Sequence, residues 1–100
     1  MEKMADIKFK RWNCRLEKGV YNNGRIALEL VNVKNDEPIL VATINIPEIH
    51  IENDEVVIKN YSENDGVLDV LVKAKIISLP IRYTTTGLIS SPICKLLLAS

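Results

Sequence analysis

Apolar and polar residues alternate along much of the first half of the chain, which is the pattern of strands that bury one face. Three segments show this alternation, at 7–18, 25–33 and 39–46. The first segment is predicted to be a strand with a change of face or a bulge near residues 11–13. Asn-Gly at the end of 21–24 tolerates the positive φ of a tight turn, and the polar residues 34–38 mark a second turn. The three strands are therefore expected to form an antiparallel meander.

The hydrophobic period changes to that of a helix after a short strand expected at 56–58. Apolar residues then recur at helical spacing, at Val67, Val70, Leu71 and Ala74. Ser62 has a side chain that suits an N-cap, and Tyr61 just before it is expected to pack as a hydrophobic staple. These signals predict a helix over 62–75 that buries the apolar stripe and exposes its charged residues.

Shorter apolar segments follow the predicted helix. The segment 76–79 is a short apolar run closed by Pro80, 81–83 fits a short strand, and 93–98 fits either a final strand or a last helical turn. Only 5% of the residues are aromatic, and a core rich in Ile and Val favours strands. The sequence therefore predicts an α+β fold, in which an antiparallel β-meander sheet of four to six strands carries one amphipathic helix on one face. We expect a single domain spanning residues 1–100.

Charge is balanced overall but unevenly distributed. Thirteen basic and thirteen acidic residues give a net charge of zero, which argues against bulk attraction to nucleic acid or to an anionic membrane. Residues 1–20 hold six basic residues against three acidic ones, whereas 48–65 holds six acidic residues against one lysine. This polarity fits either two solvated faces or an acidic patch that meets a basic partner.

Residues with catalytic or metal-binding chemistry form no recognisable motif. The four glycines are isolated, so no phosphate-binding loop is present, and there is no nucleophile elbow. His50 could join Glu52 and Asp54 in a metal site, or it could be a surface histidine beside carboxylates. Cys14 and Cys94 fit either two buried thiols or a disulfide between the chain ends. We predict no catalytic residue, no metal site and no cofactor.

No membrane or export signal is apparent. Residues 1–10 lack the apolar region of a signal peptide, and no apolar run approaches the roughly 20 residues of a membrane span. We therefore expect no membrane association and a cytoplasmic location.

Four segments, taken in order, resemble a known family. They are 23–30 (NGRIALEL), 43–47 (TINIP), 58–66 (IKNYSENDG), and 86–87 together with 92–94 (TG and PIC). Over about residues 20–96 the chain resembles the small domain-of-unknown-function family 4313, and 58–66 is the most specific part of the likeness. That family is carried on bacterial mobile elements and phages and has no assigned catalytic residues. The resemblance implies an accessory protein in a bacterial host cell that binds a host or element protein. Inhibition of a host defence system such as a CRISPR nuclease is one role of this kind.

We therefore expect a non-enzymatic protein-binding module whose partner has a basic surface. The expected partner-binding residues are Glu48, Glu52, Asp54, Glu55, Tyr61, Glu63 and Asp65. Their carboxylates converge on one edge if the strand at 56–58 and the start of the helix lie side by side. A largely exposed Tyr61 would favour a recognition role for this residue over the staple.

Two other function classes stay open. A nucleic-acid-binding module would use the basic N-terminal strand, at Lys8, Lys10, Arg11, Trp12 and Arg15, with Phe9 as a further ring that could stack on bases. The zero net charge makes this class less favoured than protein binding. The third class is an enzyme or metal protein centred on His50.

Overall fold

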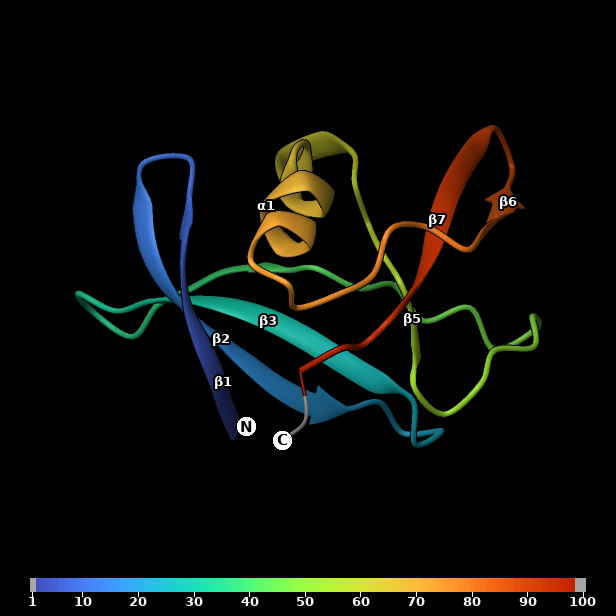
Figure 1. Cartoon of the computed structure of the whole chain (residues 1–100), viewed down its shortest axis with the longest axis horizontal. Coiled ribbons are helices and arrows are strands. Elements are labelled where there is room, and N and C mark those ends of the chain that lie inside the picture. The colour runs from blue at the N-terminus through green and yellow to red at the C-terminus, as the bar shows by residue number, and fades with distance from the viewer. Residues whose placement is uncertain (1, 99–100) are drawn as a thin grey trace.

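The computed structural model of the chain describes residues 2–98, which form seven strands, a one-turn 3₁₀ helix and one α-helix (Figure 1). In chain order the elements are β1 (Glu2–Phe9), β2 (Trp12–Val20), β3 (Ile26–Asn32), β4 (Pro38–Val41), β5 (Glu55–Val57), η1 (Ser62–Asn64), α1 (Val67–Lys73), β6 (Arg82–Thr86) and β7 (Ile89–Lys95). The strands form two antiparallel sheets, with the orders β1-β2-β3-β4 and β5-β7-β6. We call these the N-terminal sheet and the C-terminal sheet. The α+β class is confirmed, and the strands are shared between two sheets instead of forming one.

The N-terminal sheet begins with a hairpin at a place where the sequence pattern predicted a single strand with a change of face or a bulge. The segment 7–18 contains the end of β1, a two-residue turn and the start of β2. Phe9 pairs with Trp12 across the turn, and Lys10 within it has a φ of 54°. Lysine rarely adopts a positive φ, and the turn contains no Gly, Asn or Asp. No residue of the turn therefore predicts it from the sequence. The change of face near residues 11–13 therefore marks the hairpin.

The predicted meander is confirmed for β2, β3 and β4. The turn between β2 and β3 lies where Asn-Gly placed it: Gly24 has a φ of 84° and donates its N–H to the Tyr21 carbonyl at 2.9 Å. The strand β4 ends at Val41, earlier than the segment 39–46 suggested. Thr43 then forms an isolated bridge with Ile58 at the end of β5. This bridge joins the edges of the two sheets.

The C-terminal sheet has its last strand, β7, in the centre, although Pro92 lies within that strand. The Pro92 carbonyl accepts the Ile58 N–H at 2.9 Å, so the backbone polar groups of Pro92 point towards the β5 side. Ile58 lies just beyond the end of β5 at Val57, so the missing N–H falls where the β5–β7 ladder stops. Since β7 ends at Lys95, the first half of the apolar segment 93–98 belongs to the final strand and not to a helical turn.

The predicted helix over 62–75 is two shorter helices. Gly66, with a φ of 92°, separates η1 from α1. The prediction that Ser62 is the N-cap is wrong: Ser62 has a φ of 56° and makes no capping hydrogen bond. Asn60 replaces it, since its Oδ1 accepts the Leu68 N–H at 3.0 Å. The cap therefore comes from eight residues upstream instead of from the residue next to the helix.

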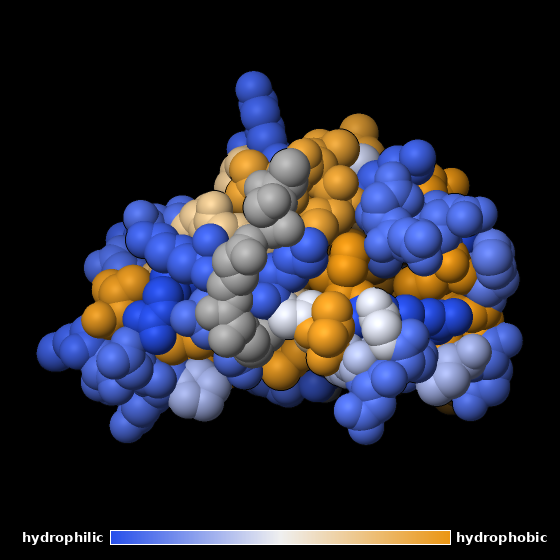
Figure 2. Space-filling view, turned by 90° about the horizontal axis from the view of Figure 1, so that it is seen from below, coloured by the Kyte–Doolittle hydropathy of each residue, from blue (hydrophilic) through white to orange (hydrophobic). Residues whose placement is uncertain are grey.

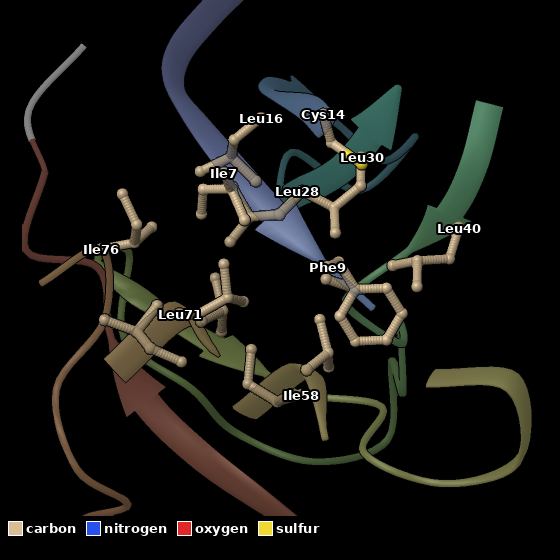
Figure 3. Close-up of a cluster of buried hydrophobic side chains, with 14 of the residues drawn as sticks. Ile7, Phe9, Cys14, Leu16, Leu28, Leu30, Leu40, Ile58, Leu71 and Ile76 are labelled. Atoms are coloured by element: carbon tan, nitrogen blue, oxygen red, sulfur yellow. The ribbon is translucent and has the colours of Figure 1, made fainter. Parts of the chain in front are cut away.

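One hydrophobic cluster fills the space between the two sheets and α1 (Figure 3). It draws Leu16, Leu28 and Leu30 from the N-terminal sheet, and Val67 and Leu71 from α1, all fully buried. Val70 is only partly buried against this cluster, as are Leu68 and Val72. Ala74 was predicted to be buried but is exposed, because α1 ends at Lys73. Asp69 and Lys73 are exposed as predicted.

The two cysteines, Cys14 and Cys94, are free and buried in the same cluster. Burial raises the pKa of both thiols, that of Cys94 to about 11. The structure therefore fits two buried thiols rather than a disulfide between the chain ends. Within residues 2–98, no helix is long and apolar enough to cross a membrane. Hydrophilic and hydrophobic residues are interspersed over the face of the molecule shown in Figure 2.

Candidate functional site

The acidic residues expected to form one edge lie in two separate places. Glu48, Glu52 and Asp54 are exposed in the loop before β5, whereas Glu63 and Asp65 are exposed at and just after η1. Figure 1 shows this loop and η1 at opposite ends of β5, with the strand and the segment after it between them. The chain runs along the length of β5 from one acidic group to the other. The prediction that these carboxylates converge on one edge is therefore wrong.

Glu55 is buried and paired, so it is not available to a partner. Its side chain is 4% exposed, and its two carboxylate oxygens accept from the Arg82 guanidinium at 2.7 and 3.0 Å. The Glu52 N–H donates to the same carboxylate at 2.9 Å. Arg82 also donates to the His50 carbonyl at 3.3 Å. The Arg82 guanidinium, helped by the Glu52 N–H, lowers the pKa of Glu55 to about 2. This arrangement ties β5, β6 and the preceding loop together.

Two other carboxylates of the loop before β5 have partners at the surface. Asp54 lies 3.7 Å from the Lys95 ammonium, and Glu52 lies 3.2 Å from His50 Nε2. These side chains are all more than half exposed, and such pairs contribute little to stability. Within residues 2–98, no group of three or more His, Cys, Asp or Glu side chains is placed to hold a metal ion. The structure thus shows His50 as a surface histidine beside a carboxylate.

A surface hollow brings together segments that the family resemblance singled out. It has a volume of about 370 Å³ and is lined by Tyr21, Val41, Thr43, Ile44, Asn45, Lys59, Tyr61 and Glu63. Thr43, Ile44 and Asn45 come from the TINIP segment, and Lys59, Tyr61 and Glu63 from the IKNYSENDG segment. Tyr21 comes from the turn before β3. We call this feature the tyrosine hollow.

Thr43 fixes one side of the tyrosine hollow. Its Oγ1 lies 2.8 Å from the Tyr21 hydroxyl and accepts the Leu28 N–H at 3.3 Å. Because Thr43 already accepts from Leu28, the buried hydroxyl is held in place and orients the half-buried ring of Tyr21. Asn45 Oδ1 accepts from Asn23 Nδ2 at 3.2 Å at the rim. Backbone bonds and side-chain bonds therefore set this side before any ligand arrives.

Lys59 organises the other side of the hollow. Its ammonium donates to Glu63 at 2.7 Å and lies 5.6 Å from the centre of the Tyr61 ring. The Lys59 N–H is bonded to the Ala42 carbonyl at 2.9 Å, which fixes the backbone at the start of this side chain. Tyr61 is half-buried, which is intermediate between the staple and the fully exposed recognition residue. The hydrogen bond between Lys59 and Glu63 raises the pKa of the lysine and lowers that of the glutamate.

Asn64 joins η1 to the end of β4, next to residues that line the hollow. It is completely buried, and its Nδ2 donates to the Val41 carbonyl at 2.7 Å. Its Oδ1 is a buried acceptor with no partner among the described residues. The side chain therefore ties η1 to the end of β4 and holds Tyr61 and Glu63 near Val41. An asparagine in a polar segment gives no sequence signal of burial, which is why this role was not predicted.

The basic N-terminal residues lie on the β1–β2 hairpin, and only some of them are free to contact a partner. Phe9 is 1% exposed, and Arg15 is paired with Glu17 and Asp36, each at 2.6 Å. Lys8, Lys10 and Arg11 are exposed. The Arg11 guanidinium lies 5.0 Å from the centre of the Trp12 ring.

Arg11 and Trp12 also line a second surface hollow, of about 390 Å³, with Asn13 of β2 and with Asn32, Val33, Lys34 and Asn35 from the β3–β4 side. This hollow has the cationic and aromatic character that suits an anion, whereas the tyrosine hollow has mixed polarity. Comparisons with protein-family models, with curated proteins and with solved structures gave no match.

Proposed function

We propose that the protein is a non-enzymatic protein-binding module that uses the tyrosine hollow as the centre of its binding surface. The observation that carries the proposal is the convergence of three separate segments, 21–24, 43–47 and 58–66, on one accessible hollow. Two of these segments, 43–47 and 58–66, are among those that carry the family resemblance, and 58–66 is its most specific part. A purely structural motif would not need to place two tyrosines and a charged pair at the surface.

The chemistry of the hollow favours recognition over catalysis. Tyrosine gives a large contact area together with a polar tip, and it is enriched at protein–protein interfaces. Lys59 and Glu63 bond to each other, and this moves the pKa of each further from neutrality. Neither group is then tuned to exchange a proton near pH 7, as a general acid or base must be. The pair instead supplies a donor and an acceptor at the rim.

The resemblance to family 4313 supplies the class of partner. It supports a host or mobile-element protein, met in the cytoplasm of a bacterial cell, with inhibition of a defence nuclease as one consequence of binding. Glu48, Glu52, Asp54, Glu63 and Asp65 contribute to this proposal as two flanking acidic groups instead of one edge. Flanking carboxylates would speed the approach of a basic partner surface more than they would tighten the complex.

The proposal is tested by capture from bacterial lysate with the full chain and two matched variants. Tyr61→Ala removes the central ring of the hollow, whereas Leu79→Ala removes a side chain that is 71% exposed elsewhere. We expect a protein that is retained by the wild type and by Leu79→Ala and is lost with Tyr61→Ala. Circular dichroism of each variant shows whether the fold is intact. Capture that is equal for all three, with all three folded, would overturn the proposal.

A second function is favoured by one observation, the exposed Arg11 on the Trp12 ring beside Lys8 and Lys10. This set could bind single-stranded nucleic acid by stacking and phosphate contact. Such binding should weaken steeply with added salt and should be reduced by Arg11→Ala. Fluorescence anisotropy with a labelled oligonucleotide at two salt concentrations decides this. A signal that neither salt nor Arg11→Ala changes would exclude the hairpin as the binding site.

A further inference from the structure

The strand β6 presents an open edge at the margin of the C-terminal sheet. Figure 1 shows it at the outer side of the molecule, separated from β5 by β7. Its sequence, Arg-Tyr-Thr-Thr-Thr, contains a single charged side chain, that of Arg82, which is held by Glu55. Tyr83 is 62% exposed, and Ile81 and Leu88 beside the strand are 46% and 103% exposed. The edge is therefore β-branched, uncharged along most of its length and bordered by apolar side chains.

The other sheet edges are protected in ways that β6 is not. β1 carries exposed Lys3, Asp6 and Lys8 and has a register shift after Lys3. β4 begins with Pro38, and its end is covered because Asn64 bonds to the Val41 carbonyl. The segment at 43–44 pairs with the end of β5. Charge, proline, irregular register and coverage are the usual means of preventing edge-to-edge pairing, and β6 lacks them.

The directions of the backbone groups of β6 follow from Pro92. The Pro92 carbonyl bonds to Ile58 on the β5 side, and proline has no N–H, so Pro92 exchanges no hydrogen bond with its register partner Tyr83. Successive residues of a strand point their N–H and C=O groups to opposite edges. Tyr83 and Thr85 therefore direct both groups away from β7, to the open edge.

We propose that a second copy of this chain pairs with β6, antiparallel, about a two-fold axis at Thr84. In this register Tyr83 of each copy faces Thr85 of the other, so the outward groups exchange hydrogen bonds directly. Each pair combines an aromatic with a β-branched side chain, which is a favourable cross-strand combination. Arg82 faces Thr86, so no like charges are opposed. The two C-terminal sheets become one continuous sheet of six strands.

The register of the edge explains why a second copy is the occupant. The backbone N–H and C=O groups that point outward belong to Tyr83 and Thr85, and these are the two positions that face each other when the strand pairs with its own copy about Thr84. A five-residue contact buries less than the roughly 1,200 Å² of a stable complex, so we expect a weak dimer. The inference is independent of the tyrosine hollow, which is lined by no residue of β6.

Cysteine cross-linking tests the register. The two Thr84 residues form a non-hydrogen-bonded pair, with Cα atoms expected about 4.5 Å apart, which lies within the range of a disulfide. Thr86→Cys is the matched control, because the two Thr86 residues would lie roughly 13 Å apart. Cys14 and Cys94 are buried and should not compete. We expect Thr84→Cys to form a covalent dimer about tenfold faster than Thr86→Cys. Equal rates, or no covalent dimer, would overturn the proposal.

Charge substitution on the exposed face tests the partner. Tyr83 and Thr85 are both exposed, so the double variants Tyr83→Lys/Thr85→Lys and Tyr83→Glu/Thr85→Glu should fold. Sedimentation velocity should show a concentration-dependent dimer for the wild type, a monomer for each variant alone and a dimer for their mixture. A wild type that stays monomeric at millimolar concentration, or a mixture no more associated than its components, contradicts pairing of two copies.

Discussion

The N-terminal and C-terminal sheets are assembled in different ways. In the N-terminal sheet every strand pairs with its neighbour in sequence, through turns of a few residues. In the C-terminal sheet β5 pairs with β7 across an intervening helix and β6. The N-terminal sheet is therefore held by local turns throughout. In the C-terminal sheet only the β6–β7 hairpin is local, and the β5–β7 pairing joins residues about forty positions apart, such as Glu55 and Lys95. Local patterns predict the first kind of sheet better than the second.

The ion pairs of the two sheets also differ, in how exposed their carboxylates are and in which strands they join. Arg15 in the N-terminal sheet is paired with Glu17 and with Asp36, and the Asp36 side chain is 75% exposed. Glu55 in the C-terminal sheet is 4% exposed and bonded to Arg82 from the strand on the other side of β7. In the C-terminal sheet, whose outer strands are not neighbours, an ion pair with a buried carboxylate thus links β5 to β6. Perturbing this pair is the most direct test of the difference.

The largest effect is expected for reversing the charge of Glu55. Glu55→Lys places a second cation beside Arg82 in a buried position and should destabilise the fold by about 3–5 kcal/mol. Asp36→Lys reverses the matching charge of the N-terminal sheet, where water solvates the side chain, and should have little effect. Urea denaturation of both variants measures the difference. Equal midpoints would show that the Glu55–Arg82 pair does not hold the C-terminal sheet.

Acidification should destabilise the protein through the same carboxylate. The pKa of Glu55 is about 2 in the folded chain against an ordinary value of 4.5, so the unfolded chain binds the proton first as the pH falls. The stabilisation is fully present above pH 4.5 and is lost as the pH falls towards 2. Its size is at most on the order of 3 kcal/mol, because water screens the partly exposed Arg82.

Guanidinium denaturation of the wild type and of Glu55→Gln across this pH range measures the effect. The variant should be less stable at pH 7 and should lose less stability on acidification, because the titrating group is absent. Parallel pH profiles for the two proteins would assign the acid sensitivity to other groups.

The sequence predicted the elements whose signals are local. The Asn-Gly turn, the alternation in 25–33 and the exposure of Asp69 and Lys73 all follow from short-range rules, and the structure agrees. The placement of β7 between β5 and β6 could not be predicted, because the residue pattern of a strand does not indicate which distant strand it pairs with. Glu55 was assigned to a surface for the same reason: its counterion, Arg82, is 27 residues away.

The candidate site was predicted in part. Tyr61 and Glu63 were expected to bind a partner, and both line the tyrosine hollow. Tyr21, Thr43 and Asn45 were not expected there, although Thr43 and Asn45 belong to a segment that carries the family resemblance. Their part in the hollow depends on the bridge between Thr43 and Ile58, which the alternation of the strands does not reveal.

A smaller effect distinguishes the two residues offered as helix caps. Asn60 bonds to the Leu68 N–H at the start of α1, so Asn60→Ala should destabilise the fold by about 1 kcal/mol. Ser62 makes no capping bond and is exposed, so Ser62→Ala should change stability by less than about 0.5 kcal/mol. Thermal unfolding of the two variants ranks them. The reverse order would restore Ser62 as the cap.

The smallest effect concerns the one turn of the N-terminal sheet that carries no turn residue. Lys10 has a φ of 54°, which is strained for any residue with a Cβ other than Asn or Asp. Lys10→Ala removes the side-chain contacts with the Phe9 ring and the Glu63 carbonyl but keeps this strain. Lys10→Gly removes both, although glycine also increases the entropy of the unfolded chain. The glycine variant should therefore be more stable than the alanine variant by about 0.5–1 kcal/mol. Chemical denaturation of the pair measures this difference, and an alanine variant at least as stable as the glycine variant would show that the β1–β2 turn is not strained at Lys10.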